Sequence, residues 1–105
     1  MYLYKILSKE NWEKSKGKEA LHLPQEDEEF IHLSTEDQLK KIIEKYWKKV
    51  PEFFILKIDA EKLPGDLRFE ANPGGTNKYY HLYNGYIPHR AIVASRTSGS
   101  NEPIK

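Results

Sequence analysis

The chain has 105 residues, a formal net charge of +1, and 38% hydrophobic against 31% charged residues. This length suits one domain, and so small a net charge argues against a dedicated nucleic-acid or membrane binder. The absence of cysteine excludes thiol nucleophiles, disulfides and cysteine-ligated metal sites. No stretch has the length and apolarity of a signal sequence or a membrane span, so we expect a cytoplasmic protein.

The N-terminal part of the chain predicts a strand, a short helix and a second strand. Residues 2–7 are rich in aromatic and branched side chains, as is typical of a strand. Ser8 is placed to cap a short helix that ends at Gly17. The acidic run at 26–29 then leads into a second predicted strand, residues 30–34.

The main helix follows this second strand. Ser34 or Thr35 is a suitable N-cap, and acidic residues follow in the first turn, where the helix dipole favours them. Apolar side chains then recur at helical spacing and predict one buried stripe with lysines pointing outward: Leu39, Ile42, Ile43, Tyr46 and Trp47. Pro51 ends the helix. Residues 53–58 form a nearly continuous apolar run, which predicts a central strand buried on both faces.

Turn residues divide the rest of the chain into short strands. Proline, glycine and asparagine at 64–66 and 72–75 predict turns, and Asn84-Gly85 predicts a two-residue hairpin. The predicted strands are 67–71, 79–83, a short one from Ile87, and 91–94. Strands follow one another without crossover helices, so the class is α+β. We expect a single domain over 1–96 and a flexible tail over 97–105.

Strand alternation sorts the polar residues onto shared faces, because successive side chains point to opposite sides of a strand. Leu67 and Phe69 are expected to face inward. The residues expected on polar faces are His32 and Ser34, Arg68 and Glu70, and His81 with Tyr79 and Tyr83. If these faces converge, they form a cleft suited to a planar ligand, with arginine for a phosphate or carboxylate. The alternative is ordinary exposed strand residues with a surface Arg68–Glu70 ion pair, and the pattern alone favours it.

Other candidates are weaker. His22 and His89 lie beside prolines and are expected to be solvated loop residues. His32, Glu70 and His81 have the right ligand types for a metal but lack local metal-binding spacing, so no metal site is predicted. A Ser34–His32 catalytic triad is not predicted either, because no aspartate is placed to orient the imidazole.

Several blocks of the sequence, in the same order, resemble the domain-of-unknown-function 952 family of small bacterial proteins. The resemblance spans roughly residues 2 to 94, and one departure is Asn84, where the family commonly runs directly from tyrosine to glycine. The blocks are Tyr4-Lys5-Ile6, Trp12, Phe30-Ile31-His32-Leu33-Ser34-Thr35, Leu67-Arg68-x-Glu70, Tyr80-His81-Leu82-Tyr83 and Ile87-Pro88.

That family is grouped by fold with ADP-ribosyltransferase-like proteins, and the order of elements is also similar to the NAD-binding half of RNA 2′-phosphotransferases. The resemblance implies a bent, split, mixed sheet with one main helix and a cleft for a dinucleotide. It implies that His32, with Ser34 beside it, contacts the dinucleotide, and that Glu70 stabilises the oxocarbenium-like transition state. A chain of 105 residues has no room for the RNA-binding lobe of the phosphotransferases, which argues against phosphate transfer.

Three functions follow as alternatives. The first is an enzyme that uses NAD as a substrate, for ADP-ribosyl transfer or NAD hydrolysis, with Glu70 and His32 as catalytic residues. The second is a non-catalytic module that binds a nucleotide or another small ligand, and the third is a protein-interaction domain with an exposed tyrosine face. The residues expected to bind the ligand are Ser34, Thr35, Arg68, His81, Tyr79 and Tyr83. The sequence identifies no certain cofactor and leaves the oligomeric state open.

Overall fold

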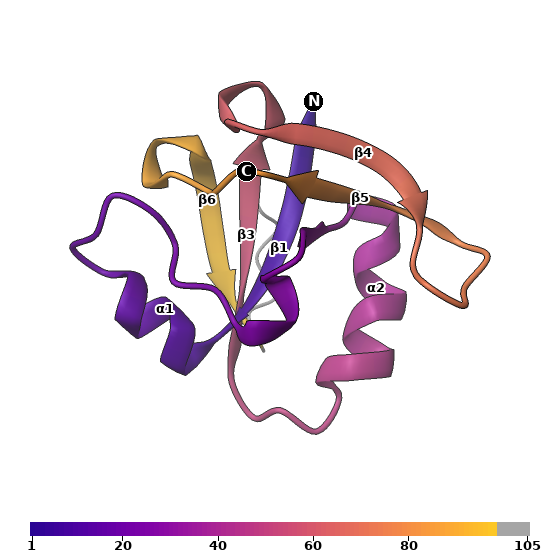
Figure 1. Ribbon diagram of the computed structural model, residues 1–105. Coiled ribbons are helices and arrows are strands. Elements are labelled where there is room, and N and C mark those ends of the chain that lie inside the picture. Colours follow the sequence, from indigo (N-terminus) through magenta and orange to yellow (C-terminus); the bar gives the residue numbers. More distant parts are fainter. Residues whose placement is uncertain (99–105) are drawn as a thin grey trace.

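The computed structural model describes residues 1–98 and contains two three-stranded sheets that meet near the N-terminal strand (Figure 1). The first sheet has the order β1-β3-β6, and its strands are β1 (Tyr2–Ser8), β3 (Phe53–Asp59) and β6 (Ile92–Thr97). The second has the order β2-β5-β4, with β2 (Ile31–Leu33), β5 (Lys78–Tyr83) and β4 (Asp66–Ala71). The α+β class and the division into two sheets are confirmed. The described strands all pair in antiparallel fashion rather than as a mixed sheet.

The first sheet supplies much of the core. The prediction of a central, buried strand is confirmed: β3 lies between β1 and β6, and its Leu56 and Ile58 side chains are completely buried. A two-way backbone bridge joins β1 to the end of β2, with Tyr4 N to Ser34 O at 2.7 Å and Ser34 N to Tyr4 O at 2.9 Å. This bridge fixes the position of the second sheet relative to the first.

Both predicted helices are present. The short helix α1 (Lys9–Ser15) begins as expected, since the Ser8 side chain accepts a hydrogen bond from Asn11 N at 3.1 Å. The main helix consists of η2 (Glu36–Gln38), α2 (Leu39–Ile42) and the π-helical turn η3 (Ile43–Trp47). Its N-cap is Thr35, in a capping box with Gln38. Short 3₁₀ turns occur at η1 (Gln25–Asp27), η4 (Ala60–Lys62) and η5 (His89–Ala91).

The predicted apolar stripe of the main helix is wrong at Tyr46, which is 63% exposed. The π-helical turn contains an extra residue relative to an α-helical turn, so it rotates this position away from the core. Ile42, Ile43 and Trp47 still pack against the second core cluster, around the buried Leu39. The helix therefore keeps an apolar face that is shorter than an unbroken 3.6-residue period predicts.

Two strand expectations also need correction. Asn84-Gly85 does not form a hairpin, and no strand begins at Ile87, because Gly85 is packed so closely against the turn before β4 that a Cβ atom would overlap the carbonyl oxygen of Pro64. Phe69, expected to face inward, is 50% exposed since β4 is the outer strand of its sheet.

The C-terminal boundary differs from the expected one at residue 96. β6 continues to Thr97, and Ser98 exchanges hydrogen bonds with Phe53, N to O at 2.8 Å and Phe53 N to the Ser98 hydroxyl at 3.0 Å. These two residues extend the sheet. The remainder of the expected tail, 99–105, lies outside the described residues.

Candidate functional site

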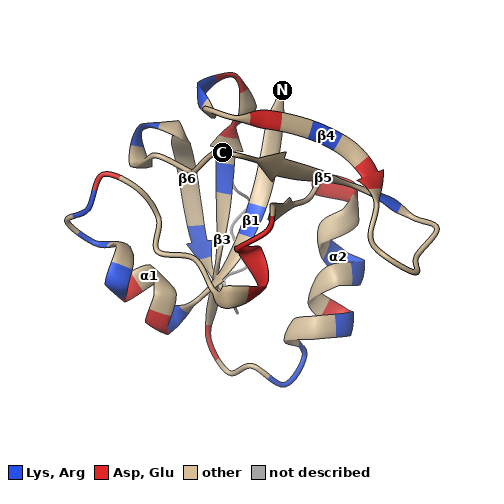
Figure 2. Cartoon of the chain, viewed as in Figure 1, with Lys and Arg blue, Asp and Glu red and all other residues tan. Residues whose placement is uncertain are grey.

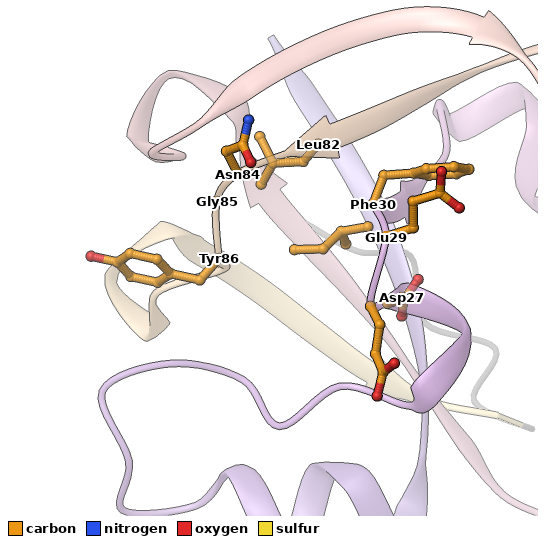
Figure 3. A pocket seen from close by; sticks show the side chains of 9 residues that line it. Asp27, Glu29, Phe30, Leu82, Asn84, Gly85 and Tyr86 are labelled. Atoms are coloured by element: carbon orange, nitrogen blue, oxygen red, sulfur yellow. The ribbon is translucent and has the colours of Figure 1, made fainter.

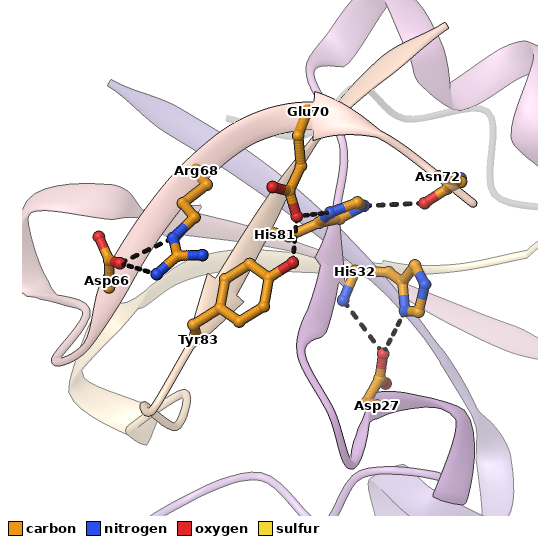
Figure 4. A network of polar contacts seen from close by, with 8 residues as sticks. All are labelled: Asp27, His32, Asp66, Arg68, Glu70, Asn72, His81 and Tyr83. Atoms are coloured by element: carbon orange, nitrogen blue, oxygen red, sulfur yellow. Dashed lines mark hydrogen bonds and ion pairs between the residues drawn. The ribbon is translucent and has the colours of Figure 1, made fainter. Parts of the chain in front are cut away.

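The second sheet brings the three predicted polar faces side by side. His32 on β2 lies opposite His81 on β5, which lies opposite Arg68 on β4. In the same ladder Glu70 lies opposite Tyr79, and Tyr83 lies opposite Asp66. Because the side-chain period of a strand is two, these residues share one face of the sheet, and Ile31, Leu33 and Leu82 on the other face are buried in the core. Figure 4 shows the resulting polar network.

His32 is held by a buried aspartate. Asp27 Oδ1 lies 2.8 Å from His32 Nδ1 and also accepts the His32 backbone N–H at 3.1 Å. The other carboxylate oxygen forms an ion pair with Lys5 Nζ at 2.7 Å, and Lys5 also donates to the His32 carbonyl oxygen at 3.0 Å. The carboxylate therefore fixes both the position of the imidazole and the atom that carries its proton.

This arrangement corrects the expectation that no aspartate orients His32. Asp27 belongs to the acidic run that precedes β2, but it alone in that run is buried, because η1 turns it inward beneath the strand. With Nδ1 bonded to Asp27, the His32 Nε2 atom has no hydrogen-bond partner among residues 1–98, and the side chain is 42% exposed. The outer nitrogen is thus available to act as a base.

The pKa of Asp27 is lowered. Burial by itself would raise it, but the hydrogen bond from His32, the charge of Lys5 and the hydrogen bond from Lys5 together outweigh that effect. Asp27 is therefore ionised at neutral pH. A buried carboxylate of this kind needs its partners, because an isolated buried charge is strongly unfavourable.

Glu70 is the centre of a second cluster. Its Oε2 atom accepts a short hydrogen bond from the Tyr83 hydroxyl and lies 2.8 Å from His81 Nδ1. The other nitrogen of His81, Nε2, lies 2.8 Å from Asn72 Oδ1. His81, expected to bind the ligand, is completely buried with both nitrogens occupied, and it holds Glu70 in position.

Glu70 itself remains accessible. Its side chain is 34% exposed, and no hydrogen bond from the described residues reaches its Oε1 atom. The hydrogen bonds from Tyr83 and then His81 lower the pKa of Glu70, and the hydrogen bond to Glu70 raises the pKa of Tyr83. At neutral pH the site therefore holds an ionised carboxylate beside a neutral phenol.

Aromatic contacts connect the two clusters. The Phe30 ring stacks on His81 with 4.1 Å between centroids and lies 4.8 Å from His32 and 5.2 Å from Tyr83. Arg68 lies over the outer part of this group, with its guanidinium carbon 4.2 Å from the Tyr83 ring centroid. Sequence reasoning placed Phe30 in the strand but gave it no part in the site.

Arg68 pairs with Asp66 and not with Glu70. Its Nε and Nη2 atoms both lie 2.8 Å from Asp66 Oδ2. Asp66 is two residues away on the same strand, so the two side chains lie on one face. Hydrogen bonding to Asp66 and the charge of Asp66 raise the pKa of Arg68.

The remaining sequence candidates lie at the edge of the site or outside it. Ser34 is buried and forms the backbone bridge to β1, and Thr35 caps the main helix and hydrogen-bonds Asp37 at 2.6 Å. His22 is exposed, as expected. His89, expected to be solvated, is half-buried, with its ring centroid 6.0 Å from that of Trp12, because η5 packs it against α1.

A pocket of about 250 Å³ adjoins the polar face at Phe30 (Figure 3). One wall is formed by residues 27–30 and the other by residues 84–86, and Ile31 and Leu82 lie between them. No group of three histidine, aspartate or glutamate residues in the described part of the chain is arranged to hold a metal ion. No helix within residues 1–98 has the length and apolarity needed to cross a membrane.

Comparison with known proteins identifies a family and solved structures of similar fold. Residues 6–95 match the family model described as "Protein of unknown function (DUF952)". The crystal structure of protein CC0527 from Caulobacter crescentus is similar with a TM-score of 0.79 and 28% identity, over 92% of this chain and 85% of that chain. A double mutant of CC0527 gives a TM-score of 0.78 and 27% identity over the same shares. No curated protein matches the chain.

Proposed function

Since the chain belongs to the DUF952 family of proteins of unknown function, we propose its activity from the site itself. We propose that the polar face of the second sheet binds an NAD-like nucleotide and cleaves the bond between nicotinamide and ribose. The observation that carries this proposal is the state of Glu70, whose Oε2 is held by Tyr83 and His81 while Oε1 remains free. The resemblance to ADP-ribosyltransferase-like enzymes supports the same reaction.

Glu70 would act on the ribose. As the C1′–N bond breaks, nicotinamide leaves with the bonding electron pair and positive charge develops at C1′ and the ring oxygen. A fixed, ionised carboxylate stabilises that charge, and removal of such a preorganised group typically costs about 10²- to 10³-fold in rate. The lowered pKa of Glu70 keeps the carboxylate charged at neutral pH.

His32 would act as the general base that deprotonates the acceptor. Its Nδ1–H is donated to Asp27, so Nε2 can take a proton from a water molecule or from another acceptor hydroxyl that attacks C1′. The acceptor oxygen forms the new bond to C1′, and its proton passes to Nε2. This division of roles assigns the two catalytic residues to different strands, β2 and β4.

Arg68 and the tyrosines would bind the rest of the nucleotide. The Arg68 side chain is half exposed, and its Nη1 atom makes no hydrogen bond within residues 1–98, so it can donate to a phosphate. Tyr79 and Tyr83 lie on the same face and offer rings for stacking. Ser34 and Thr35, expected to bind the ligand, are given no part in this proposal, since Ser34 is part of the bridge between sheets and Thr35 caps a helix.

The test is release of nicotinamide from NAD by the purified protein, measured by chromatography. We expect Glu70→Gln and His32→Ala each to reduce the rate at least ~100-fold, about the loss of one electrostatic or general-base group. Glu61→Gln, an exposed carboxylate on η4, is the matched control and should behave as wild type. The enzymatic proposal fails if wild type releases no nicotinamide, or if Glu70→Gln is as active as wild type.

A non-catalytic binding module is the second candidate, and the burial of His81 is compatible with it. A ring completely buried, with both nitrogens bonded, gives a rigid surface that suits recognition as well as catalysis. If the protein only binds, NAD or a related nucleotide at about 100 times its dissociation constant should stabilise it by about 2.7 kcal/mol without being consumed. A thermal-shift titration followed by analysis of the nucleotide distinguishes the two candidates.

A further inference from the structure

The pocket beside the polar face lies where two paired strands separate. β2 and β5 are paired from Leu33–Tyr80 to Ile31–Leu82, and beyond the Ile31–Leu82 pair the two segments of the chain diverge. Residues 28–30 continue from one strand and residues 84–86 from the other, and they form facing walls (Figure 3). The buried side chains of Ile31 and Leu82 lie at the point of separation. The pocket is therefore built from backbone on two sides and apolar side chains at its base.

Part of the backbone in each wall is left without partners. Among residues 1–98, the N–H and C=O groups of Gly85 and Tyr86 make no hydrogen bond, and the same holds for Glu29 on the opposite wall. Gly85 cannot be replaced by a larger residue without a clash, since it abuts the turn at Pro64, so this wall has a fixed shape. Unpaired carbonyl oxygens can accept hydrogen bonds from a ligand, and unpaired N–H groups can donate to one, so the charge of the wall decides between the two.

The charge of the pocket is negative. Glu28 and Glu29 line it, both are exposed, and neither forms an ion pair with any described residue. The charge of Asp27 is already balanced by Lys5, so the two glutamates supply the uncompensated charge. Figure 2 shows the acidic segment that leads into β2 as a continuous red stretch. Such a wall attracts cations and repels phosphates.

One aromatic ring belongs to the wall next to the polar face. Phe30 lines the pocket and its ring stacks on His81, whereas the Tyr86 ring is exposed and points away from Phe30 (Figure 3). A flat cation stacks on an aromatic ring while its N–H groups reach carboxylate and carbonyl oxygens at the edge. An ammonium group is compact and strongly hydrated, so it binds less tightly than a guanidinium to a ring and a carboxylate together.

The same sheet face already holds one guanidinium in this way. Arg68 donates through two nitrogens to Asp66 and lies over the ring of Tyr83, so its guanidinium contacts a carboxylate and an aromatic ring at the same time. The pocket offers an equivalent pair in Glu29 and Phe30, with no guanidinium of the described chain among the residues that line it. We propose that this pocket binds the guanidinium group of an organic cation, either a free guanidine compound or an arginine side chain of another molecule.

The experiment is an NMR titration of the ¹⁵N-labelled protein without any nucleotide, so that its outcome does not depend on the cleavage proposed above. The probes are agmatine for a free guanidine, N-acetyl-arginine amide for an arginine side chain, and butylamine for an ammonium. We expect saturable shifts of the amide signals of residues 28–30 and 84–86 with the first two probes, and at least tenfold weaker binding of butylamine. The tighter of the two guanidine probes identifies the source.

A matched pair of double variants completes the test. Glu28→Gln with Glu29→Gln should weaken agmatine binding at least tenfold, whereas Glu44→Gln with Glu61→Gln, which removes the same charge from exposed positions outside the pocket, should leave it unchanged. The proposal is overturned if no saturable shift occurs or if butylamine binds as tightly as agmatine. It is equally overturned if the two double variants weaken binding to the same degree. If the protein releases nicotinamide but binds no agmatine, the proposed enzymatic activity is supported and only the proposal of a guanidinium-binding pocket is refuted.

Discussion

Replacement of Asp27 by asparagine tests whether the buried Lys5–Asp27–His32 group supports the fold. The asparagine side chain is nearly the same size and could still accept the two hydrogen bonds from His32, so the change removes charge rather than shape. Lys5 would then keep its charge in a buried position without a counter-ion, beside an amide in place of the carboxylate that now lies 2.7 Å away. Breaking a buried ion pair from one side typically costs about 3–5 kcal/mol. We expect about 3 kcal/mol, the low end, because the hydrogen bonds are retained.

The measurement is urea unfolding followed by tryptophan fluorescence, with Glu26→Gln as the control because this neighbouring carboxylate is exposed. The control should change the free energy of unfolding by no more than about 0.5 kcal/mol. Adding Lys5→Met to Asp27→Asn should recover stability, since the unpaired charge is removed. A loss below about 1 kcal/mol for Asp27→Asn, with no recovery in the double variant, would refute the reasoning.

The same pair gives a pH dependence with a defined sign. The folded-state pKa of Asp27 is lowered relative to its unfolded value of about 3.9. Its contribution is therefore present in full above that unfolded pKa and is lost as the pH falls through the lower folded pKa. The stability difference between wild type and Asp27→Asn should be constant from about pH 7 to pH 5 and shrink below about pH 4, near the unfolded pKa of Asp. A difference that stays constant down to about pH 2 would show that the charge of Asp27 does not stabilise the fold.

Three further variants test other features of the structure. Tyr83→Phe removes the largest cause of the lowered pKa of Glu70, so an NMR titration of the Glu70 carboxyl should show its pKa rising toward the ordinary value; an unchanged pKa would contradict the assigned hydrogen bond. Gly85→Ala places a Cβ against backbone and should lower stability by about 2 kcal/mol or more in thermal unfolding, the upper part of the range for overpacking. Tyr46→Ala should cost less than about 0.5 kcal/mol in urea unfolding, as surface changes do, whereas Trp47→Ala should cost about 2 kcal/mol or more; equal costs would mean that the π-helical turn does not rotate Tyr46 out of the core.

Periodicity in the sequence was sufficient to predict the polar face. The alternation around His32, Arg68, Glu70 and His81 requires only that each segment be extended, and the strands found at β2, β4 and β5 meet that condition. The caps at Ser8 and the main helix were predictable for the same reason, since a cap depends on residues three positions apart. These are local properties, and local sequence determines them.

Where local sequence patterns compete with packing, the tertiary structure decided which conformation the chain adopts. Asn84-Gly85 carries a strong hairpin signal, yet the close approach of Gly85 to the turn at Pro64 directs the chain elsewhere. The stripe of the main helix is periodic through Tyr46, yet a π-helical turn places that ring in solvent. In both places the contacts of neighbouring segments outweigh the preference of a few residues.

The partner of His32 was likewise decided by tertiary structure. Asp27 is the one aspartate of the acidic run, but the sequence does not indicate which of these carboxylates is buried, and Lys5 lies 27 positions before His32 in the chain. Only the packing of η1 beneath β2 and beside β1 buries one carboxylate and brings a lysine to it. The sequence by itself determined which residues share a face of the sheet, because that follows from a two-residue period. Folding determined which of them are bonded, buried or free, because those properties depend on the distances between segments that are remote in the chain.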